Sequence, residues 1–342
     1  MIFNLTKLML ANTMMIGVIM TICTNNWITM WMGLEMSLLS LMPFMQNKSK
    51  LSSESMMKYF IIQSVASTML IISVIYMLIG VNMMNEMIMT TSMLIKLGLA
   101  PFHNWVLMII EGMDYLSLLC LLTVLKLPPI AILYQVNSKM LMMPIIISMI
   151  LSSISCMNQS SIKKTLGYSS IFNLSLMTTA ISKINMTFTL MVIYTAMMTM
   201  LVVSLMKNKT NFINQIVSNS FSPWTKINLW INMLSMSGFP PTTGFILKLI
   251  VIINLFSNNE VTLTFLKLIV IINLFSNNEV TLTLIVLVTS MLVSMFYMRM
   301  AFSSMMNFYT HKKWNMNLTS TLFLMTFNLT LFPFIMSLVS IS

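Results

Sequence analysis

Long apolar stretches separated by short polar segments recur along the whole chain of 342 residues. A helix needs about 20 residues to cross the ~30 Å hydrocarbon core of a bilayer, and most of the stretches are close to that length. The pattern predicts an all-α fold, a polytopic membrane helix bundle of about 11 transmembrane helices forming a single domain, 1–342. The expected spans are Leu8–Cys23, Trp27–Met45, Tyr59–Gly80, Met87–Ala100, Leu116–Gln135, Met140–Met157, Leu166–Ile181, Phe188–Met206, Ile227–Phe256, Thr281–Met298 and Leu318–Val339.

The composition supports this class, because 58% of the residues are hydrophobic and 7% are charged, against about 25% charged in soluble domains. The net charge of +11 is dispersed rather than clustered, so no nucleic-acid partner is expected. With eleven alternating spans, the loops opposite the N-terminus carry only Lys139 and Lys183. Inner-side loops are enriched in Lys and Arg, so we expect the N-terminus on the inner side. Its loops carry twelve basic residues: Lys7, Lys48, Lys50, Lys58, Lys163, Lys164, Lys207, Lys209, Lys226, Arg299, Lys312 and Lys313.

The sequence lacks the residues that most bound redox centres need. Cys23, Cys120 and Cys156 form no C-x-x-C pair, so no iron–sulfur cluster or disulfide framework is indicated. His103 and His311 are too few for a multi-haem cytochrome, whose irons need paired axial ligands. The chain also has no G-x-G-x-x-G or G-x-x-x-x-G-K-[ST] motif. We therefore expect no cofactor, nucleotide or metal in this chain.

Eighteen residues occur twice, as Leu247–Thr264 and again as Leu266–Thr283, at an offset of nineteen. Two identical copies are not a solenoid, whose repeats diverge and number three or more. The second apolar run, Phe265–Phe275, would extend only ~16 Å as a helix, about half the membrane core. We interpret the second copy as a tandem duplication or a sequence artefact that lies outside the bundle.

Five ionisable residues are expected at or near membrane depth: Glu35, Lys96, His103, Lys126 and Lys248. A charge at the centre of a span costs about 2.5–3.5 kcal/mol on insertion scales, so such residues usually have a function. The alternative is that a lysine near a helix end extends to the interface. It does not fit Lys126, well inside its span, or Glu35, whose side chain is short.

Two of the lysines lie beside helix-breaking segments. Lys96 precedes the segment Gly98–Pro101, whereas Lys248 follows the segment Gly238–Gly244. A broken helix frees backbone groups that lipid cannot satisfy, so it survives only where it is buried in protein or lines a wet cavity. Breaks at corresponding places in two inverted repeats typically mark an ion path. The alternative is a pair of proline kinks that serve packing.

A lysine at such a place can carry a proton. Burial favours its neutral amine, and a nearby carboxylate favours the ammonium, so moving the carboxylate's charge switches the lysine. We expect Glu35 to act on Lys96 in this way, with Lys126 continuing the relay and Lys248 ending it.

Five blocks of residues stand out along the chain. They are Asn26-Trp27 with Trp31-Met-Gly-Leu-Glu35; Lys58-Tyr-Phe-Ile-Ile-Gln63; Lys96-x-Gly98-x-Ala100-Pro101-Phe102-His103-x-Trp105; Asn158-Gln159-x-Ser161-Ile-Lys163-Lys164 followed by Tyr168-Ser169-Ser170-Ile171; and Gly238-Phe-Pro240-Pro241-x-x-Gly244-Phe245. Together, and in this order, they resemble subunit 2 of mitochondrial NADH:ubiquinone oxidoreductase (respiratory complex I), an antiporter-like membrane subunit family. The resemblance covers about residues 20–300.

The resemblance implies a core subunit of the mitochondrial inner membrane that helps to move protons from the matrix to the intermembrane space. It implies no redox cofactor in this chain, an N-terminus on the matrix side, and inverted repeats with two discontinuous helices. The implied partners are other core and accessory subunits of complex I and the lipid bilayer, with cardiolipin as a candidate ligand. The family's relay residues match Glu35, the modulating glutamate, and Lys96, Lys126 and Lys248.

The chain departs from the family pattern at three places. Asn173 occupies a position where the family usually has histidine, and an amide can hydrogen-bond but not titrate. Leu247 and Leu249 flank Lys248 where the family has proline and tryptophan. Finally, Lys248 matches the family by its upstream break, whereas Lys267 matches by its spacing to Phe296-Tyr297-Met298-Arg299.

Two other functions remain open. A stand-alone cation/proton secondary antiporter would use the same buried charges, but it should have its own substrate site with Asp or Asn at the midplane. The only Asp is Asp114, expected in a loop. A passive scaffold subunit would tolerate neutral replacement of its buried lysines.

Overall fold

The structure is a computed structural model that describes residues 5–47, 49–80, 82–136, 139–181, 183–218, 223–240, 242–257 and 278–305. Every regular element in these ranges is a helix, and the one pairing of extended backbone is an isolated bridge between Ser161 and Phe212. The chain divides into two compact units, Met1–Ser148 with Ile181–Ile184, and Met149–Ala180 with Asn185–Ser342. Each unit is described by itself below.

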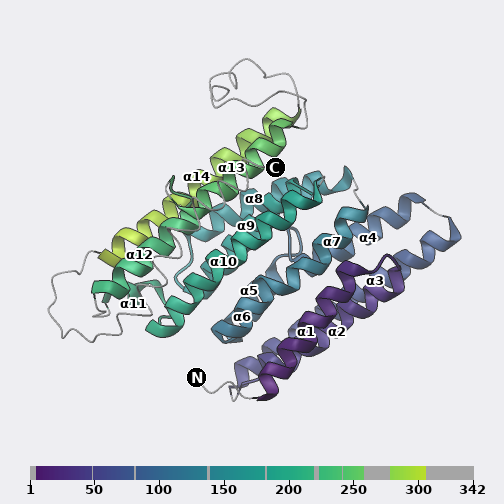
Figure 1. The fold of residues 1–342 in the computed structure, drawn as a ribbon, viewed down its shortest axis with the longest axis horizontal. Helices are drawn as coiled ribbons and strands as arrows, with labels where there is room; N and C mark the ends of the chain where they lie inside the picture. The colour runs from purple at the N-terminus through teal and green to yellow at the C-terminus, as the bar shows by residue number, and fades with distance from the viewer. Residues whose placement is uncertain are drawn as a thin grey trace. The chain divides into compact units, whose positions relative to one another are not determined.

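The first unit begins with two antiparallel pairs of helices. Helix α1 lies against α2, and α3 lies against α4; α3 also contacts α2 and α5, and α4 contacts α7 (Figure 1). The elements are α1 (Leu5–Cys23), α2 (Trp27–Met45), α3 (Lys50–Ile79), α4 (Asn82–Leu97), α5 (Asn104–Gly112), α6 (Tyr115–Leu122), the 3₁₀ turn η1 (Val124–Lys126), α7 (Leu127–Val136), the 3₁₀ turn η2 (Lys139–Leu141) and α8 (Met142–Met157), whose greater part belongs to the second unit.

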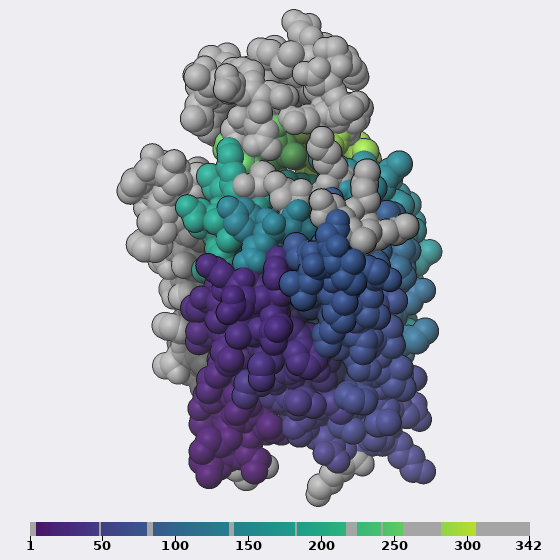
Figure 2. All heavy atoms as spheres, turned by 90° about the vertical axis from the view of Figure 1, so that its right-hand side faces the viewer, coloured from purple at the N-terminus to yellow at the C-terminus, as the bar shows by residue number. Residues whose placement is uncertain are grey.

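Two glycines allow α1 and α2 to approach closely. A Cβ atom on Gly17 would lie 2.8 Å from the carbonyl oxygen of Gly33, and one on Gly33 would lie 2.6 Å from Cγ2 of Thr21. Small residues are typical of membrane helix interfaces, where backbone proximity replaces the hydrophobic effect as the source of attraction. Figure 2 shows this side of the unit, with the purple to blue side chains of α1–α4 packed together.

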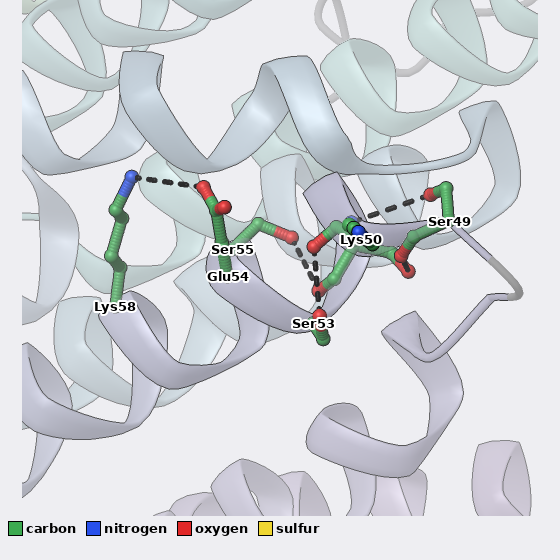
Figure 3. Close-up of polar contacts among 7 residues, drawn as sticks. Ser49, Lys50, Ser53, Glu54, Ser55 and Lys58 are labelled. Atoms are coloured by element: carbon green, nitrogen blue, oxygen red, sulfur yellow. Dashed lines mark hydrogen bonds and ion pairs between the residues drawn. The ribbon is translucent and has the colours of Figure 1, made fainter.

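Helix α3 extends beyond the apolar stretch that defines its span. It begins at Lys50, nine residues before the expected Tyr59, because Ser49 caps it by accepting a hydrogen bond from the backbone N–H of Ser52 (Figure 3). On the exposed side of this first part, Lys58 and Glu54 form an ion pair at 3.9 Å (Figure 3). The polar start of α3 therefore continues the helix outside the apolar span.

The second unit packs α12 along α14, with α13 contacting α9, α12 and α14 (Figure 1). The backbone bridge joins the segment before α9 to the segment after α10, since Ile162 N–H donates to Asn211 and Ile213 N–H donates to Ser160, both at 3.0 Å. The elements are the rest of α8, α9 (Ile162–Thr179), α10 (Ile184–Asn208), α11 (Ile213–Ser218), α12 (Pro223–Ser237), α13 (Thr243–Ser257) and α14 (Asn278–Met305).

The expected membrane helix bundle is confirmed, while its number of spans stays a prediction. Six stretches are long and apolar enough to cross a membrane, and Met142–Met157 and Thr243–Leu255 are shorter apolar helices. The expected last span, Leu318–Val339, lies outside the described residues, as do most of the second repeat copy and Lys267. The six stretches are Leu5–Cys23, Trp27–Met45, Lys50–Ile79, Tyr115–Val136, Ile184–Asn208 and Leu282–Met305.

One expected span is less regular than its apolar pattern indicates. The stretch Leu116–Gln135 is not one continuous helix but α6, η1 and α7 in succession. Pro128 and Pro129 lie two and three residues after Lys126, and neither has the N–H that would donate to a carbonyl one turn earlier. The backbone therefore tightens into a 3₁₀ turn beside Lys126.

Candidate functional site

Helix α4 ends in a Schellman motif at Gly98, whose φ of +68° is left-handed. The N–H of Gly98 donates to Ile95 at 3.1 Å and the N–H of Leu99 to Leu94 at 3.2 Å. These bonds satisfy two of the last carbonyls of α4 and leave the carbonyl of Leu97 free of a backbone donor within the motif. A Cβ atom on Gly98 would collide with Cγ2 of Val106, so glycine is required here both by its backbone conformation and by space.

Helix α12 ends in the same motif at Gly238, where φ is +75°. Here the N–H of Gly238 donates to Ser235 at 3.2 Å and the N–H of Phe239 to Leu234 at 3.3 Å. The carbonyl of Ser237 is therefore the counterpart of the Leu97 carbonyl at the other break. The sequence prediction of two discontinuous helices is confirmed. The structure adds that α4 and α12, the first half of each, both end in a Schellman motif.

At each break, a lysine side chain donates a hydrogen bond to the carbonyl that the Schellman motif leaves free. Nζ of Lys126 donates to the carbonyl of Leu97 at 2.6 Å, and Nζ of Lys248 donates to the carbonyl of Ser237 at 2.7 Å. The Lys248 ammonium also lies 3.4 Å from the carbonyl of Ser290 on α14. Carbonyls at a helix C-terminus carry partial negative charge and attract cations, so both positions suit an ammonium ion. Because lipid offers no water, these bonds also satisfy backbone groups that the breaks expose.

The two lysines reach their carbonyls by different routes. Lys126 comes from η1, on another span than the α4 carbonyl that it binds, and its side chain is only 2% exposed. Lys248 comes from α13, the second half of the same broken helix as Ser237. A Cβ atom on Gly238 would lie 3.0 Å from Nζ of Lys248, so the glycine makes room for this ammonium.

A small cavity joins Lys96 and Lys126 in the first unit. It offers about 20 Å³ to the centres of water molecules, enough for at least one water. Lys96 is 5% exposed and comes from the last turn of α4. The remaining lining residues are Leu34, Ser37, Leu38, Tyr59, Gln63, Trp105, Leu121, Leu125 and Pro129.

Glu35, on α2, interacts with two residues that line this cavity. Its carboxylate interacts electrostatically with Lys96 and with Tyr59. Its Oε1 atom is buried, and no hydrogen-bond partner for it is found among the described residues. Glu35 and Lys96 form no direct ion pair in that part of the chain. The carboxylate is thus near enough to influence the lysine without being locked to it.

The other expected site residues lie outside the cavity lining. His103 is at the N-cap position of α5, half-buried, and its Nδ1 is buried without a hydrogen-bond partner among the described residues. Lys248 belongs to the second unit and lies at its own break. Asn173 is buried within α9.

Sequence reasoning did not assign Tyr59, Gln63 and Trp105 to the site, although all three line the cavity. Each belongs to one of the blocks that carry the family resemblance. A signal was present, since Gln63 is a polar residue in the apolar part of α3 and Trp105 follows directly on the break.

Comparison with known proteins bears on what this arrangement does. The family described as NADH:quinone oxidoreductase/Mrp antiporter, TM, matches residues 24–276. The NADH-ubiquinone oxidoreductase chain 2 of Anopheles gambiae is 34% identical over 257 residues, 72% of this chain and 75% of the relative. This chain belongs to the NADH-ubiquinone oxidoreductase chain 2 family. The Locusta migratoria member is 30% identical over 323 residues, which cover 91% of this chain and 89% of that one.

Solved structures agree with the family at the level of the fold. A chain of respiratory complex I from Thermus thermophilus aligns with a TM-score of 0.79 at 16% identity, covering 96% of this chain and 77% of that one. A chain of the archaeal membrane-bound sulfane sulfur reductase aligns with a TM-score of 0.76 at 15% identity, covering 96% and 73%. The helical architecture is therefore shared by subunits of several respiratory membrane complexes.

Proposed function

We propose that this chain is a core membrane subunit of the proton-pumping NADH:ubiquinone oxidoreductase. It moves protons through a buried relay of Glu35, Lys96, Lys126 and Lys248. The observation that carries the proposal is the hydrogen bond from Lys126 to the Leu97 carbonyl, repeated by Lys248 on Ser237. The two bonds satisfy backbone carbonyls that the breaks expose, but a neutral donor would satisfy them as well, whereas a buried ammonium adds a group that can release and take up a proton.

The relay chemistry follows from the interactions that the Lys126 side chain loses when it is deprotonated. As an ammonium, Lys126 donates to the Leu97 carbonyl and gains from the C-terminal end of α4. As a neutral amine it keeps a weaker bond and loses the charge–dipole attraction, but it no longer suffers desolvation. A neighbouring charge therefore shifts the balance between the two forms. Lys96, across the same cavity, is such a neighbour.

Glu35 supplies the control in this scheme. While ionised, it favours the ammonium form of Lys96, with which it interacts electrostatically. When Glu35 is neutralised, or its charge is drawn elsewhere, Lys96 releases its proton toward the cavity water and Lys126. His103, at the start of α5, is a further residue of the relay that can exchange a proton.

The proposal also places the chain in the cell. It lies in the mitochondrial inner membrane as a multi-pass subunit with its N-terminus in the matrix, and it has no redox centre of its own. Its partners are the other core and accessory membrane subunits of the complex and the surrounding lipid. The excess of basic residues in the loops on the N-terminal side supports this orientation.

The test is to replace Lys126 by methionine in the assembled complex. Methionine keeps the volume and the apolar stem but removes the proton-carrying nitrogen. Reconstituted complexes should then translocate several-fold fewer protons for each NADH oxidised, while native gels show normal assembly. Lys50→Met, at the exposed start of α3, is the matched control and should pump like the unmodified complex. An assembled Lys126→Met complex with an unchanged ratio of protons to electrons would contradict the proposal.

A further inference from the structure

The indole ring of Trp105 lies beside both the end of α4 and the ammonium of Lys126. Trp105 is the second residue of α5 and is 6% exposed. Its ring faces the ammonium that donates the hydrogen bond on which the proposed function rests. A Cβ atom on Gly98 would lie 3.2 Å from Cζ2 of Trp105, so the ring abuts the broken backbone itself.

The ring is fixed in place by a bond to α4. Nε1–H of Trp105 donates to the carbonyl of Ile95 at 3.0 Å. Ile95 directly precedes Lys96, and its carbonyl also accepts from the N–H of Gly98. The ring also packs against the tilted ring of Tyr59, with centroids 6.2 Å apart. Trp105 therefore cannot rotate without breaking a bond in the last turn of α4.

The face of the fixed ring is directed to Lys126. Nζ of Lys126 lies 5.2 Å from the ring centroid. A cation within about 6 Å of an aromatic face is attracted by the ring quadrupole, and tryptophan gives the strongest attraction of the three aromatic residues. A neutral amine gains almost nothing from the same geometry. The ring thus favours one protonation state of Lys126 over the other.

The charges around Lys126 make this contribution important. The residues that line the shared cavity include no carboxylate, while Lys96 adds a like charge that opposes a second ammonium. Of the titratable groups on the elements around Lys126, only Tyr59 and Lys96 line the cavity with it. Those that do not are Lys7 and Cys23 on α1, Glu35 on α2, Lys50, Glu54, Lys58 and Tyr76 on α3, Glu86 on α4, Glu111 on α5, Tyr115 and Cys120 on α6, and Tyr134 on α7.

We propose that Trp105 is a positioning residue of the relay, which holds Lys126 as an ammonium against the Leu97 carbonyl until the charge on Lys96 changes. This inference rests on the proposed function. Trp105 carries no proton itself. Its ring is bonded to the last turn of α4, which bears Lys96, and the same ring stabilises the ammonium of Lys126. The position of that turn therefore affects the proton affinity of Lys126. A shift of that turn would move the ring and weaken its hold on the ammonium.

The test compares Trp105→Phe and Trp105→Leu in the assembled, reconstituted complex by measuring NADH-driven proton translocation as a function of pH. Loss of the ring removes a stabilisation of the ammonium, so Lys126 loses its proton at lower pH. The alkaline limb of the pumping profile should move to lower pH by about one unit in Trp105→Leu, and by roughly half as much in Trp105→Phe, which keeps a weaker aromatic face. Trp230→Leu, a half-buried tryptophan of α12, is the control and should leave the limb in place.

Two further outcomes separate this inference from the proposed function. Suppose that Lys126→Met abolishes proton translocation, while Trp105→Leu leaves the alkaline limb of the pH profile where it is. The role of Trp105 is then wrong, and the relay stands. If Lys126→Met pumps normally, the relay itself is wrong. Should Trp105→Leu fail to assemble, Trp105→Phe decides alone, and an unmoved limb in that variant overturns the inference.

Discussion

The ammonium nitrogen of Lys126 lies 2.6 Å from the carbonyl oxygen of Leu97, the last residue of α4 before the left-handed Gly98. Lys248 makes the same bond, at 2.7 Å, to Ser237, the last residue before the left-handed Gly238. In both cases the Schellman motif satisfies the carbonyls of the fourth-last and third-last residues and leaves that of the last residue for the lysine. The breaks therefore create the lysine sites, rather than merely lying beside them.

The first prediction concerns the glycine that forms the break. Gly98→Ala forces a side chain into a left-handed conformation, which costs about 1–2 kcal/mol, and drives its Cβ into Val106. We expect lower thermal stability of the complex and a several-fold loss of proton translocation, because the Leu97 carbonyl moves away from Lys126. Thermal unfolding of the purified complex and pumping in vesicles measure the two effects.

Gly80→Ala is the control for that prediction. Gly80 also has a left-handed φ, +89°, but a Cβ atom there would meet nothing within 4 Å. The variant should therefore lose thermal stability only through its left-handed backbone conformation, and it should retain its proton translocation. Equal pumping by the Gly98→Ala and Gly80→Ala complexes would show that the break does not position Lys126.

The second prediction tests the control by Glu35. Because its carboxylate favours the ammonium of Lys96, Glu35→Ala should slow proton uptake several-fold. Glu35→Asp keeps the charge on a shorter stem and should retain part of the activity. Stopped-flow measurement of proton uptake by vesicles distinguishes the variants. If Glu35→Ala takes up protons at the unmodified rate, Glu35 does not control Lys96.

Much of this arrangement could be predicted from the sequence. The second span, Trp27–Met45, has the same bounds in the structure. The two breaks were predictable because Gly and Pro act locally. Glu35, Lys96 and Lys126 were predictable as unusual charges in apolar runs. Their roles in a relay stay predictions.

The geometry of the site could not be predicted in the same way. That Lys126 binds a carbonyl 29 residues earlier in the chain depends on how α4 and α7 pack. The 3₁₀ turn at Lys126 was missed because the hydrophobic pattern of a span does not register a local change of helix type. In the sequence, Trp105 cannot be distinguished from an ordinary core residue. Only the structure shows that its ring faces an ammonium.

The third prediction concerns the contact between α1 and α2. Gly17→Leu would place a large side chain where even a Cβ atom lies 2.8 Å from the Gly33 carbonyl. Overpacking of this kind costs about 1–3 kcal/mol, so we expect less assembled complex on native gels. Met15→Leu changes an exposed side chain of the same helix and should have no effect. Normal assembly of the Gly17→Leu variant would show that α1 does not depend on this crossing.

The last prediction assigns function to one of the two repeat copies. Lys248, in the first copy, follows Gly238 closely enough to bind the Ser237 carbonyl, and it also approaches Ser290 on α14. Lys267, in the second copy, lies outside the described residues, and its apolar run is too short to cross the membrane. Lys248→Met should therefore reduce proton translocation several-fold, whereas Lys267→Met should not change it. Each variant serves as the control for the other, because both remove one lysine from an identical local sequence. The reverse result would mean that the second copy has replaced the first as the partner of the break, despite the position of Lys248 on Ser237.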